Sequence, residues 1–319
     1  MAQKRILFID LPGQKTLPDG SMIRISGALG EITCVTDAAA AETALNAIHD
    51  LAIVVCNTAH FDIFTAIRRR HPHARIMLVT DETMEKYSAK LNNSEDALVD
   101  HVVANRAPSP WTLHEFRVTL QKLIRGDIFG LEKYVAPGTA VQHLTVKGSA
   151  DREPFNSQVM AFADQNRLGH YMSKLAFGIS EELLMNAIYD APIAAGRTHY
   201  GELPRTSAIV LQPDEYSTLS FACDGTILGI GIADPFGALK RDKLFQYLKK
   251  VVKRADSANL IDTKKGGAGL GFFKILYSSH ALVVNVHPGQ RTEVIALIDI
   301  EHQVRDFAKM ARSIHYFLA

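Results

Sequence analysis

EELLMNAIYDA, residues 181–191, is the stretch that decides how the second half of the chain is organised. Leu, Met, Ala and Glu dominate it, and these residues favour an α-helix. Glu182 and Asn186 stand four residues apart, so they share one helix face beside rows of apolar side chains. Taken alone, such a pair is explained more simply as a surface Glu and Asn on an amphipathic helix.

Two later stretches change this interpretation. IADPFG at residues 232–237 is an apolar strand pattern that ends in Asp near a Gly, and GGAGLG at residues 266–271 is a glycine-rich turn. The chain thus carries, in this order, a helix with a Glu four residues before an Asn, a strand that ends in Asp, and a GxGLG turn. This order of motifs resembles that of the GHKL (Bergerat-fold) ATPases. Within that family the second half is most similar to the anti-sigma-factor serine kinases and to the ATPase domains of histidine kinases.

The other predicted elements of the second half agree with this resemblance, which covers about residues 139–300. The fold that it implies is the α/β sandwich of the GHKL ATPase domain. Helices are predicted at residues 156–168, 170–190 and 272–278. Strands are predicted at residues 141–146, 208–211, 217–223, 226–234, 283–286 and 293–298.

The polar pair on the first helix carries the chemistry that the resemblance implies. An ATP triphosphate needs a divalent cation, and Mg²⁺ favours few protein oxygens and several waters. The resemblance makes Asn186 the metal ligand, and Glu182 the catalytic base that takes a proton from an attacking hydroxyl or water. Glu181 points about 100° away and is expected to be solvated. Asp190 stands one turn further on, where many relatives carry a basic residue.

The strand that ends in Asp234 is the second part of the implied site. In the family this Asp accepts a hydrogen bond from the adenine amino group. The family pattern is Asp-x-Gly-x-Gly, whereas this chain reads DPFG at residues 234–237, so only Gly237 remains as a cofactor-binding glycine, in a shifted register. The alternative interpretation of Asp234 is a turn residue at the end of a strand.

The glycine-rich turn is the third part. Glycine lets backbone N–H groups approach phosphate, and the N-terminus of the following helix favours anions. Residues 239–265 match the ATP lid, from which Lys264 and Lys265 would reach the terminal phosphates, unless they are simply solvated charges. The cofactor-binding residues that the resemblance implies in the turn itself are Gly267, Gly269, Leu270 and Gly271.

In the first half, short apolar runs alternate with helical patterns, which predicts a doubly wound parallel sheet. Residues 1–128 resemble the receiver domain of two-component response regulators. That family needs an acidic cluster after the first strand, a phosphoacceptor Asp after the third and a Lys after the fifth. Here Asp10 stands alone, the third strand ends in Asn57 after Cys56, and the fifth ends near Asn105.

We therefore predict a pseudo-receiver that cannot be phosphorylated at the usual position, although Thr80 fits the switch hydroxyl of that family. Its role would be to bind a partner or a second copy of itself; the alternative is a plain structural α/β domain. The predicted domains are a pseudo-receiver at residues 1–128 and a GHKL-type ATP-binding domain at residues 129–319. An amphipathic helix predicted at residues 301–318 ends the chain and packs on its own first half, on a second copy or on a partner.

Composition bounds the classes of function. The chain has 319 residues, 47% of them hydrophobic and 22% charged, with a net charge of +1. Because the net charge is close to zero, the chain has no overall positive electrostatic potential that would attract it to nucleic acid or to an acidic membrane. Three cysteines in apolar runs favour reduced thiols, and no signal peptide or spanning helix is predicted, so we expect a cytoplasmic protein.

The resemblance implies ATP and Mg²⁺ as cofactors and a regulatory protein as substrate or partner, with a homodimer as a further option. One hypothesis is an enzyme, a serine/threonine protein kinase of the anti-sigma-factor-kinase type. The other is a non-catalytic, ATP-sensing adaptor that recruits partners through its pseudo-receiver and lid. A stand-alone ATP-hydrolysing clamp is a third interpretation, but that class needs a transducer domain after the last strand.

Overall fold

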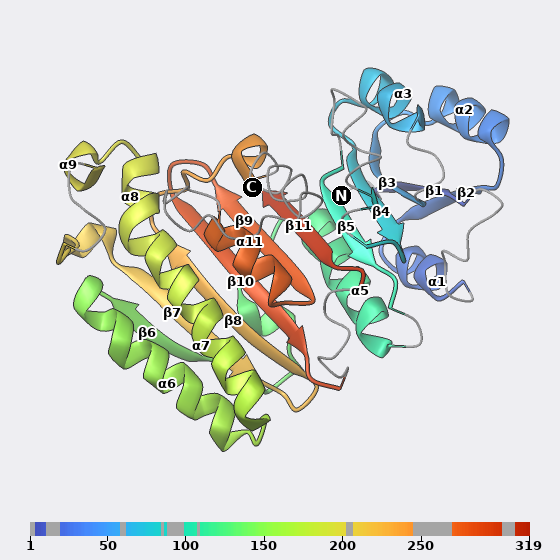
Figure 1. Cartoon of the computed structure of the whole chain (residues 1–319). Coiled ribbons are helices and arrows are strands. Elements are labelled where there is room, and N and C mark those ends of the chain that lie inside the picture. Colours follow the sequence, from blue (N-terminus) through green and yellow to red (C-terminus); the bar gives the residue numbers. More distant parts are fainter. Residues whose placement is uncertain are drawn as a thin grey trace. The chain divides into compact units, whose positions relative to one another are not determined.

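A computed structural model describes residues 4–10, 20–57, 62–83, 86–87, 99–106, 109–201, 207–244, 270–301 and 310–319. The chain divides into two compact units. The first unit comprises Met1–Asp127 with Lys309–His315, and the second comprises Ile128–Ala308 with Tyr316–Ala319. Each unit combines helices with a β-sheet, so the prediction of an α/β chain is confirmed (Figure 1).

The first unit contains five parallel strands in the order β2-β1-β3-β4-β5. Nearly every residue of β1, β3, β4 and β5 is buried, as expected for a parallel sheet whose two faces are both covered. Helices α1 and α5 lie on one face, and α2 and α3 lie on the other (Figure 1). The bounds are β1 Arg5–Ile9, α1 Ser21–Gly27, β2 Glu31–Val35, α2 Ala38–Ala47, β3 Leu51–Asn57, α3 Asp62–Arg70, β4 Arg75–Thr80, β5 His101–Ala104 and α5 Pro110–Arg125.

Local signals set the ends of these helices. Asp37 precedes α2, and its carboxylate accepts a hydrogen bond of 2.7 Å from the backbone N–H of Ala40. Pro110 opens α5, where its missing N–H costs no helical hydrogen bond. Gly126 ends α5 with φ +74, a left-handed conformation that favours glycine. The helices of this half thus begin and end where the sequence pattern changes.

The C-terminal residues correct one prediction, because Ser313–Leu318 form strand β11 and not the end of an amphipathic helix. Ile314 pairs with Val102 and His315 with His101, antiparallel to β5. Periodicity cannot distinguish a short buried helix from a buried strand, and β-branched and aromatic residues favour a strand here. The predicted helix also covered residues 302–309, which lie outside the described residues.

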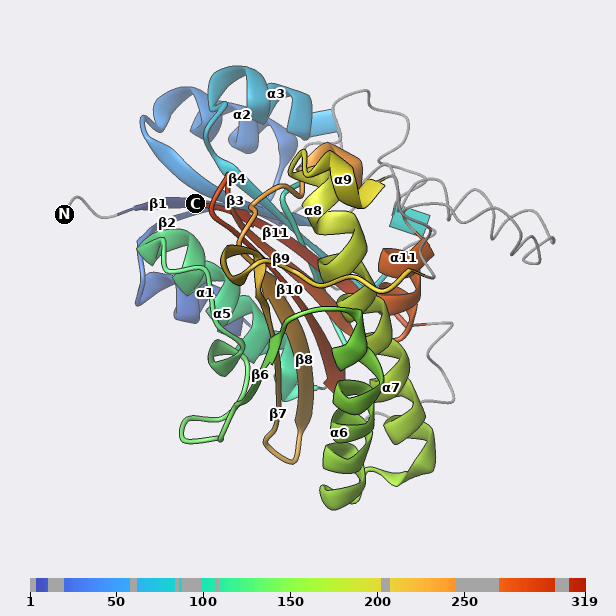
Figure 2. The same ribbon diagram turned by 90° about the vertical axis from the view of Figure 1, so that its left-hand side faces the viewer.

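The second unit contains antiparallel strands in the order β9-β10-β8-β7-β6. Helices α6, α7 and α11 lie on one face of this sheet (Figure 2). The strand predicted at residues 208–211 is wrong, since only an isolated bridge between Gly148 and Val210 forms there. The strands are β6 Gln142–Val146, β7 Ser217–Cys223, β8 Ile227–Asp234, β9 Ala281–His287 and β10 Arg291–Asp299. The helices and helical turns are η2 Leu131–Lys133, η3 Ser149–Asp151, α6 Arg152–Gln165, α7 Gly169–Met185, η4 Asn186–Asp190, α8 Ala191–Ala194, α9 Thr198–Gly201, η5 Pro213–Glu215 and α11 Leu270–Tyr277.

One turn of π-helix, η4, interrupts the long helix that the sequence predicts at residues 170–190. In this turn the backbone N–H of Ala191 donates to the carbonyl of Asn186, five residues earlier. Pro192 follows at once and has no N–H, so a regular α-helical ladder cannot continue through this point. A π turn inside a helix is often found at a functional site, because it changes which side chains share a face.

Residues 128–135 join the second unit as a packed segment. Ile128, Leu131 and Tyr134 are buried, and a Cβ atom at Gly229 would lie 2.4 Å from Cδ1 of Leu131. Buried Glu293 accepts a hydrogen bond of 2.9 Å from the backbone N–H of Gly130. These contacts pack residues 128–135 against strands β8 and β10 of the second unit. No helix in the described part of the chain is long and apolar enough to cross a membrane.

Candidate functional site

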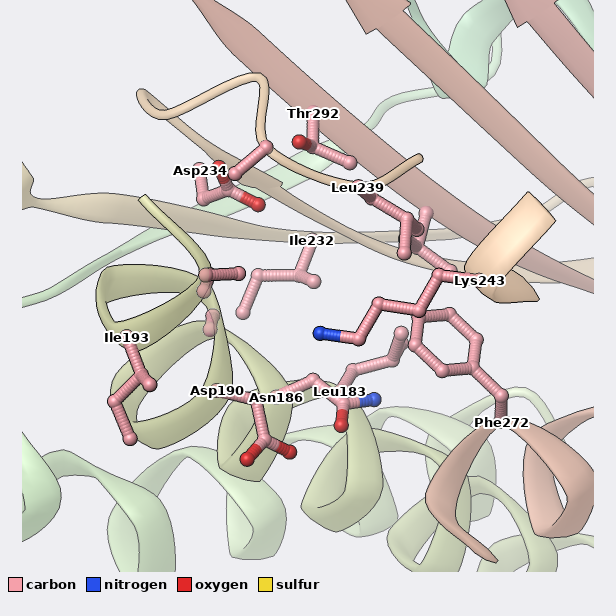
Figure 3. Close-up of a pocket in the computed structure, with 15 residues that line it drawn as sticks. Leu183, Asn186, Asp190, Ile193, Ile232, Asp234, Leu239, Lys243, Phe272 and Thr292 are labelled. Atoms are coloured by element: carbon pink, nitrogen blue, oxygen red, sulfur yellow. The ribbon is translucent and has the colours of Figure 1, made fainter. Parts of the chain in front are cut away.

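A cavity of about 270 Å³ lies in the second unit (Figure 3). This volume is slightly below the usual range for ligand-binding pockets, about 300–1,000 Å³. One wall is the helical run through η4 and α8, and the other is formed by β8, β10 and the segment that follows Asp234. The lining residues are Leu183, Asn186, Ala187, Asp190, Ala191, Ile193, Ala194, Ile232, Asp234, Ala238, Leu239, Lys243, Phe272, Thr292 and Val294.

Most of this lining is apolar, with a few polar groups at defined places. Such a surface suits a flat, largely apolar ligand that is oriented by a small number of hydrogen bonds and charges. Two of the residues predicted from the sequence, Asn186 and Asp234, line this one cavity. They come from different elements, a helical turn and the end of a strand, so only the fold brings them together.

Asp234 ends β8 opposite Thr292 of β10 and is only 8% exposed. Its carboxylate accepts a hydrogen bond of 2.9 Å from the backbone N–H of Phe236, and the Thr292 hydroxyl also hydrogen-bonds to it. Burial raises the pKa of Asp234 to about 6, although these hydrogen bonds oppose the shift. At neutral pH the group is therefore mostly ionised and acts as a hydrogen-bond acceptor inside an apolar cavity.

Gly237 shapes the turn after Asp234 instead of lining the cavity. Its φ is +60, and a Cβ atom at this position would lie 2.1 Å from the carbonyl oxygen of His287 and 2.6 Å from the backbone nitrogen of Gly289. Only glycine fits such a close approach of two backbones. The structure therefore supplies a steric reason for Gly237 and does not place it among the lining residues, where the sequence placed a cofactor contact.

Glu182, Asn186 and Gly271 lie next to one another. A Cβ atom at Gly271 would lie 2.9 Å from Oε2 of Glu182 and 3.4 Å from Oδ1 of Asn186. The first turn of α11 therefore packs directly on the polar pair of the α7–η4 run, so the candidate base and metal ligand touch the end of the glycine-rich turn. The amide nitrogen of Asn186 is buried and has no hydrogen-bond partner among the described residues.

The Asn186 side chain is compatible with the implied metal. Its amide nitrogen has no hydrogen-bond partner among the described residues, and its amide oxygen can face a cation in the cavity. Asp190 adds a carboxylate to the same wall. Mg²⁺ takes one or two protein oxygens and completes its shell with water and phosphate, so this donor set fits. The described residues contain no cluster of three or more His, Cys, Asp or Glu that would hold a metal without a ligand.

Lys274 is a site residue that sequence reasoning missed. Its Nζ lies 2.5 Å from Oε1 of Glu182. Lys274 stands three residues after Gly271 on α11, so it shares the helix face that meets Glu182. That spacing was available in the sequence, but nothing local indicated which element this face would meet.

Glu181 corrects a further expectation, since its side chain is only 28% exposed and is held by contacts with α6. Its carboxylate forms an ion pair with Arg152 and accepts a hydrogen bond of 2.7 Å from the side-chain amide of Asn156. Asn156 in turn accepts a hydrogen bond of 2.6 Å from the Ser180 hydroxyl. These contacts join α6 to α7, so Glu181 holds the helix that carries Glu182.

Most of the predicted phosphate-binding residues lie outside the described residues. These are Lys264, Lys265, Gly267 and Gly269. Leu270 is the first residue of α11, and Gly271 is the member of the turn that the structure places against Glu182 and Asn186. Lys243, which the sequence did not single out within the predicted lid, lines the cavity.

The first unit was predicted to have lost its phosphoacceptor chemistry. The strand β3 ends in Asn57, which is buried, and the hydroxyl of Thr80 accepts a hydrogen bond of 3.0 Å from the backbone N–H of Glu82. Arg106, the cation nearest to the expected Lys position, is buried and pairs with Glu115 at 2.8 Å. It is thus engaged within the core of the unit.

Glu115 also contacts His315 of β11, with 2.8 Å between Oε1 and Nε2. Burial by itself raises the pKa of the Glu115 carboxyl, but Arg106 and His315 outweigh it and hold that pKa below its usual value. These buried contacts among Arg106, Glu115 and His315 fix the first residues of β11 on β5 and α5.

No protein-family model and no curated protein matches the chain. Among solved structures, the chain is similar to one in the crystal structure of the SiaB–SiaC complex from Pseudomonas aeruginosa, with 15% sequence identity and a TM-score of 0.31. The match covers 49% of this chain and 89% of that chain. A similarity at this level identifies neither a family nor an activity.

Proposed function

We propose that the second unit binds ATP with Mg²⁺ in the cavity described above, as a GHKL-type domain. The observation that carries this proposal is that Asn186 and Asp234, predicted as metal ligand and adenine contact, line one cavity. The contact of Gly271 with Glu182 and Asn186 supports it, because the resemblance places the glycine-rich turn next to that pair.

Each group has a role that its surroundings suit. The ionised carboxylate of Asp234 accepts a hydrogen bond from the amino group of the base, while Ile232, Leu239 and Val294 supply apolar surface for its faces. Asn186 holds the Mg²⁺ that neutralises the phosphates. The N-terminus of α11, which begins at Leu270, offers backbone N–H groups to those phosphates.

The reaction that we propose is transfer of the terminal phosphoryl group to a serine or threonine of a regulatory protein. Glu182 is the base that takes the proton of the attacking hydroxyl, which contributes about 10²–10⁴-fold to the rate. The ion pair with Lys274 occupies Oε1 of Glu182, while Oε2 lies beside Gly271, where the phosphates are expected. The protein is then a serine/threonine protein kinase of the anti-sigma-factor-kinase type.

A second candidate is a non-catalytic, ATP-sensing adaptor that acts in the cytoplasm through protein partners. Two observations favour it. Pro235 and Phe236 replace residues of the family's adenine motif, and Phe236 is buried in the turn. The first unit has the strand order β2-β1-β3-β4-β5 of receiver-like folds but ends β3 in Asn57, so it would bind partners without being phosphorylated.

Both candidate functions require ATP binding, which calorimetry on the full chain with ATP and Mg²⁺ tests. We expect saturable binding that Asp234→Asn weakens and that Asn186→Ala weakens while making it less dependent on Mg²⁺. Asp242→Asn is the matched control, because Asp242 is exposed and does not line the cavity. A folded wild-type chain that gives no heat with millimolar nucleotide would overturn the proposal.

Labelled ATP then separates the two candidates. Transfer of label to a partner protein, or release of labelled phosphate, supports the kinase. Tight binding of ATP without either product supports the adaptor.

A further inference from the structure

A dense group of cationic side chains surrounds the end of α3 in the first unit. RRRHPHAR at residues 68–75, here called the basic turn, holds four arginines and two histidines in eight positions. Helix α3 ends at Arg70, the backbone N–H of Ala74 donates to the carbonyl of His71 at 3.0 Å, and β4 begins at Arg75. The group is therefore gathered where the chain turns from α3 into β4 (Figure 1).

Part of the basic turn is used to hold its own backbone. Arg68 donates a hydrogen bond of 2.7 Å to the buried carboxylate of Asp100, and Arg70 pairs with Glu42 of α2 at 2.8 Å. Nε2 of His71 lies 2.8 Å from a carbonyl oxygen of α2. Since these contacts tie the turn to α2 and to the start of β5, its conformation is fixed before any ligand arrives, which lowers the entropy lost on binding.

The remaining cationic groups are not used in this way. Arg69 and His73 are exposed, and neither makes a hydrogen bond or an ion pair within the described part of the chain. The hydrogen bond and charge of Arg70 lower the pKa of the Glu42 carboxyl, and the charge of Arg69 adds to this effect. Among the described residues the carboxylates that pair with the four arginines are those of Glu42 and Asp100, so the surface keeps an excess of positive charge.

The size of the basic turn favours a short acidic protein segment over nucleic acid. Guanidinium groups match the planar carboxylate and bind it with two parallel hydrogen bonds. Nucleic-acid binding instead depends on neutralising many phosphates along an extended backbone. Here the cations are confined to one helix end, and Glu42, whose side chain is 64% exposed, stands beside them and would repel a long chain of phosphates. The net charge of the whole chain is only +1.

We propose that the basic turn is a docking surface for an acidic segment of a partner protein. Carboxylates of that segment pair with Arg69 and hydrogen-bond to His73. Arg75 is a further contact, because its side chain is 38% exposed and lies 3.8 Å from Asp100, a loose pairing. This inference goes beyond the nucleotide site and needs no residue of the second unit. It gives the first unit a partner-binding surface that does not depend on phosphorylation.

Fluorescence anisotropy with a labelled polyglutamate peptide tests the proposal on the full chain, without nucleotide. The wild type should bind the peptide saturably, and binding should weaken as salt is added, because the contacts are exposed charges. Arg69→Glu should lower the affinity about tenfold or more, since it replaces an attractive charge with a repulsive one. His73→Glu should lower it in the same direction.

Arg125→Glu is the matched control. Arg125 is exposed and lies in the last turn of α5, so the variant makes the same charge change at the end of another helix of the same unit. It should bind the peptide as the wild type does, and both arginine variants should keep the wild-type melting temperature.

The proposal is overturned if the wild type does not bind the peptide, or if Arg69→Glu binds it as the wild type does. It is also overturned if Arg125→Glu weakens binding equally, which would show an effect of net charge alone, or if the wild type binds oligothymidylate more tightly than polyglutamate, which would indicate a nucleic-acid site. Because the assay contains no nucleotide, its result is independent of whether the second unit binds ATP.

Discussion

The Nζ atom of Lys274 lies 2.5 Å from Oε1 of Glu182, although the two residues are 92 positions apart in the chain. The pair joins α11 to α7 beside Gly271 and fixes one oxygen of the carboxylate that we propose as the base. The Lys274 side chain is 62% exposed, so water screens the attraction. The pair therefore orients Glu182 more than it stabilises the fold.

Lys274→Met should change the free energy of unfolding by less than about 1 kcal/mol, because exposed ion pairs contribute little. Turnover of ATP should fall, since Glu182 loses the partner that holds its orientation, and Lys274→Arg should restore most of it. The dissociation constant for ATP should stay the same, because Lys274 does not line the cavity. Thermal unfolding, turnover assays and calorimetry check the three parts; a loss of several kcal/mol would show that the pair is structural.

Glu182→Gln separates catalysis from binding. Glutamine keeps the size and much of the hydrogen bonding of glutamate but cannot accept a proton at neutral pH. Turnover should fall by about 10²-fold or more, whereas ATP affinity should change little. Single-turnover assays and calorimetry measure these two effects. If the variant loses binding instead of turnover, the role of Glu182 as a base is wrong.

Gly271→Ala tests the contact between α11 and the polar pair. Its Cβ would lie 2.9 Å from Oε2 of Glu182, so the carboxylate or the helix must move and turnover should drop. Gly178→Ala is the control, because a Cβ at Gly178 meets nothing within 4 Å and Gly178 lies inside α7. Replacing that helical glycine should stabilise the protein by about 0.5–1 kcal/mol and leave turnover unchanged. Equal behaviour of the two variants would contradict the proposed packing.

Asp234 should make stability depend on pH. Its pKa is about 6 in the folded chain, against an ordinary value of 3.8 for an Asp carboxyl, so between these values the folded chain binds the extra proton. Stability therefore falls as pH rises from about 4 to about 6 and then levels off, by an amount on the order of 3 kcal/mol. Urea unfolding of the wild type and of Asp234→Asn at pH 4 to 7 measures this. The difference between the two proteins should follow that curve; a difference that is constant with pH would contradict the burial of this carboxyl.

The first unit should take no phosphoryl group from a small donor such as acetyl phosphate. Asn57 ends β3 where an acceptor Asp is needed, and an amide does not form an acyl phosphate. Arg106 is held by Glu115 in the core and does not replace the missing Lys. Intact-mass measurement after incubation should show no added phosphate, and a gain of one phosphate mapped to residues 1–127 would refute the prediction.

Much of the fold could be predicted because its signals are local. The apolar runs of β1, β3 and β4 and the helical pattern of α7 each depend on a period that the chain carries within one element. The residues 313–318 show the limit of this reasoning, because Ile314 and Leu318, four residues apart, fit the period of an amphipathic helix although they lie in a strand. Pairing with β5 decided for the strand.

The sequence by itself determined the chemistry that the chain offers: an Asn one turn after a Glu, an Asp at a strand end and a glycine-rich turn, in a recognisable order. Only the tertiary structure decided which of these groups share a space. It brought Asn186 and Asp234 to one cavity, gave Gly237 a steric role, paired Lys274 with Glu182 and placed the exposed Lys243 on the lining of that cavity. The physical reason is that side-chain type is a property of one position, whereas a contact between distant positions depends on how helices and strands pack. A single π turn before Pro192 is enough to change which residues face a ligand.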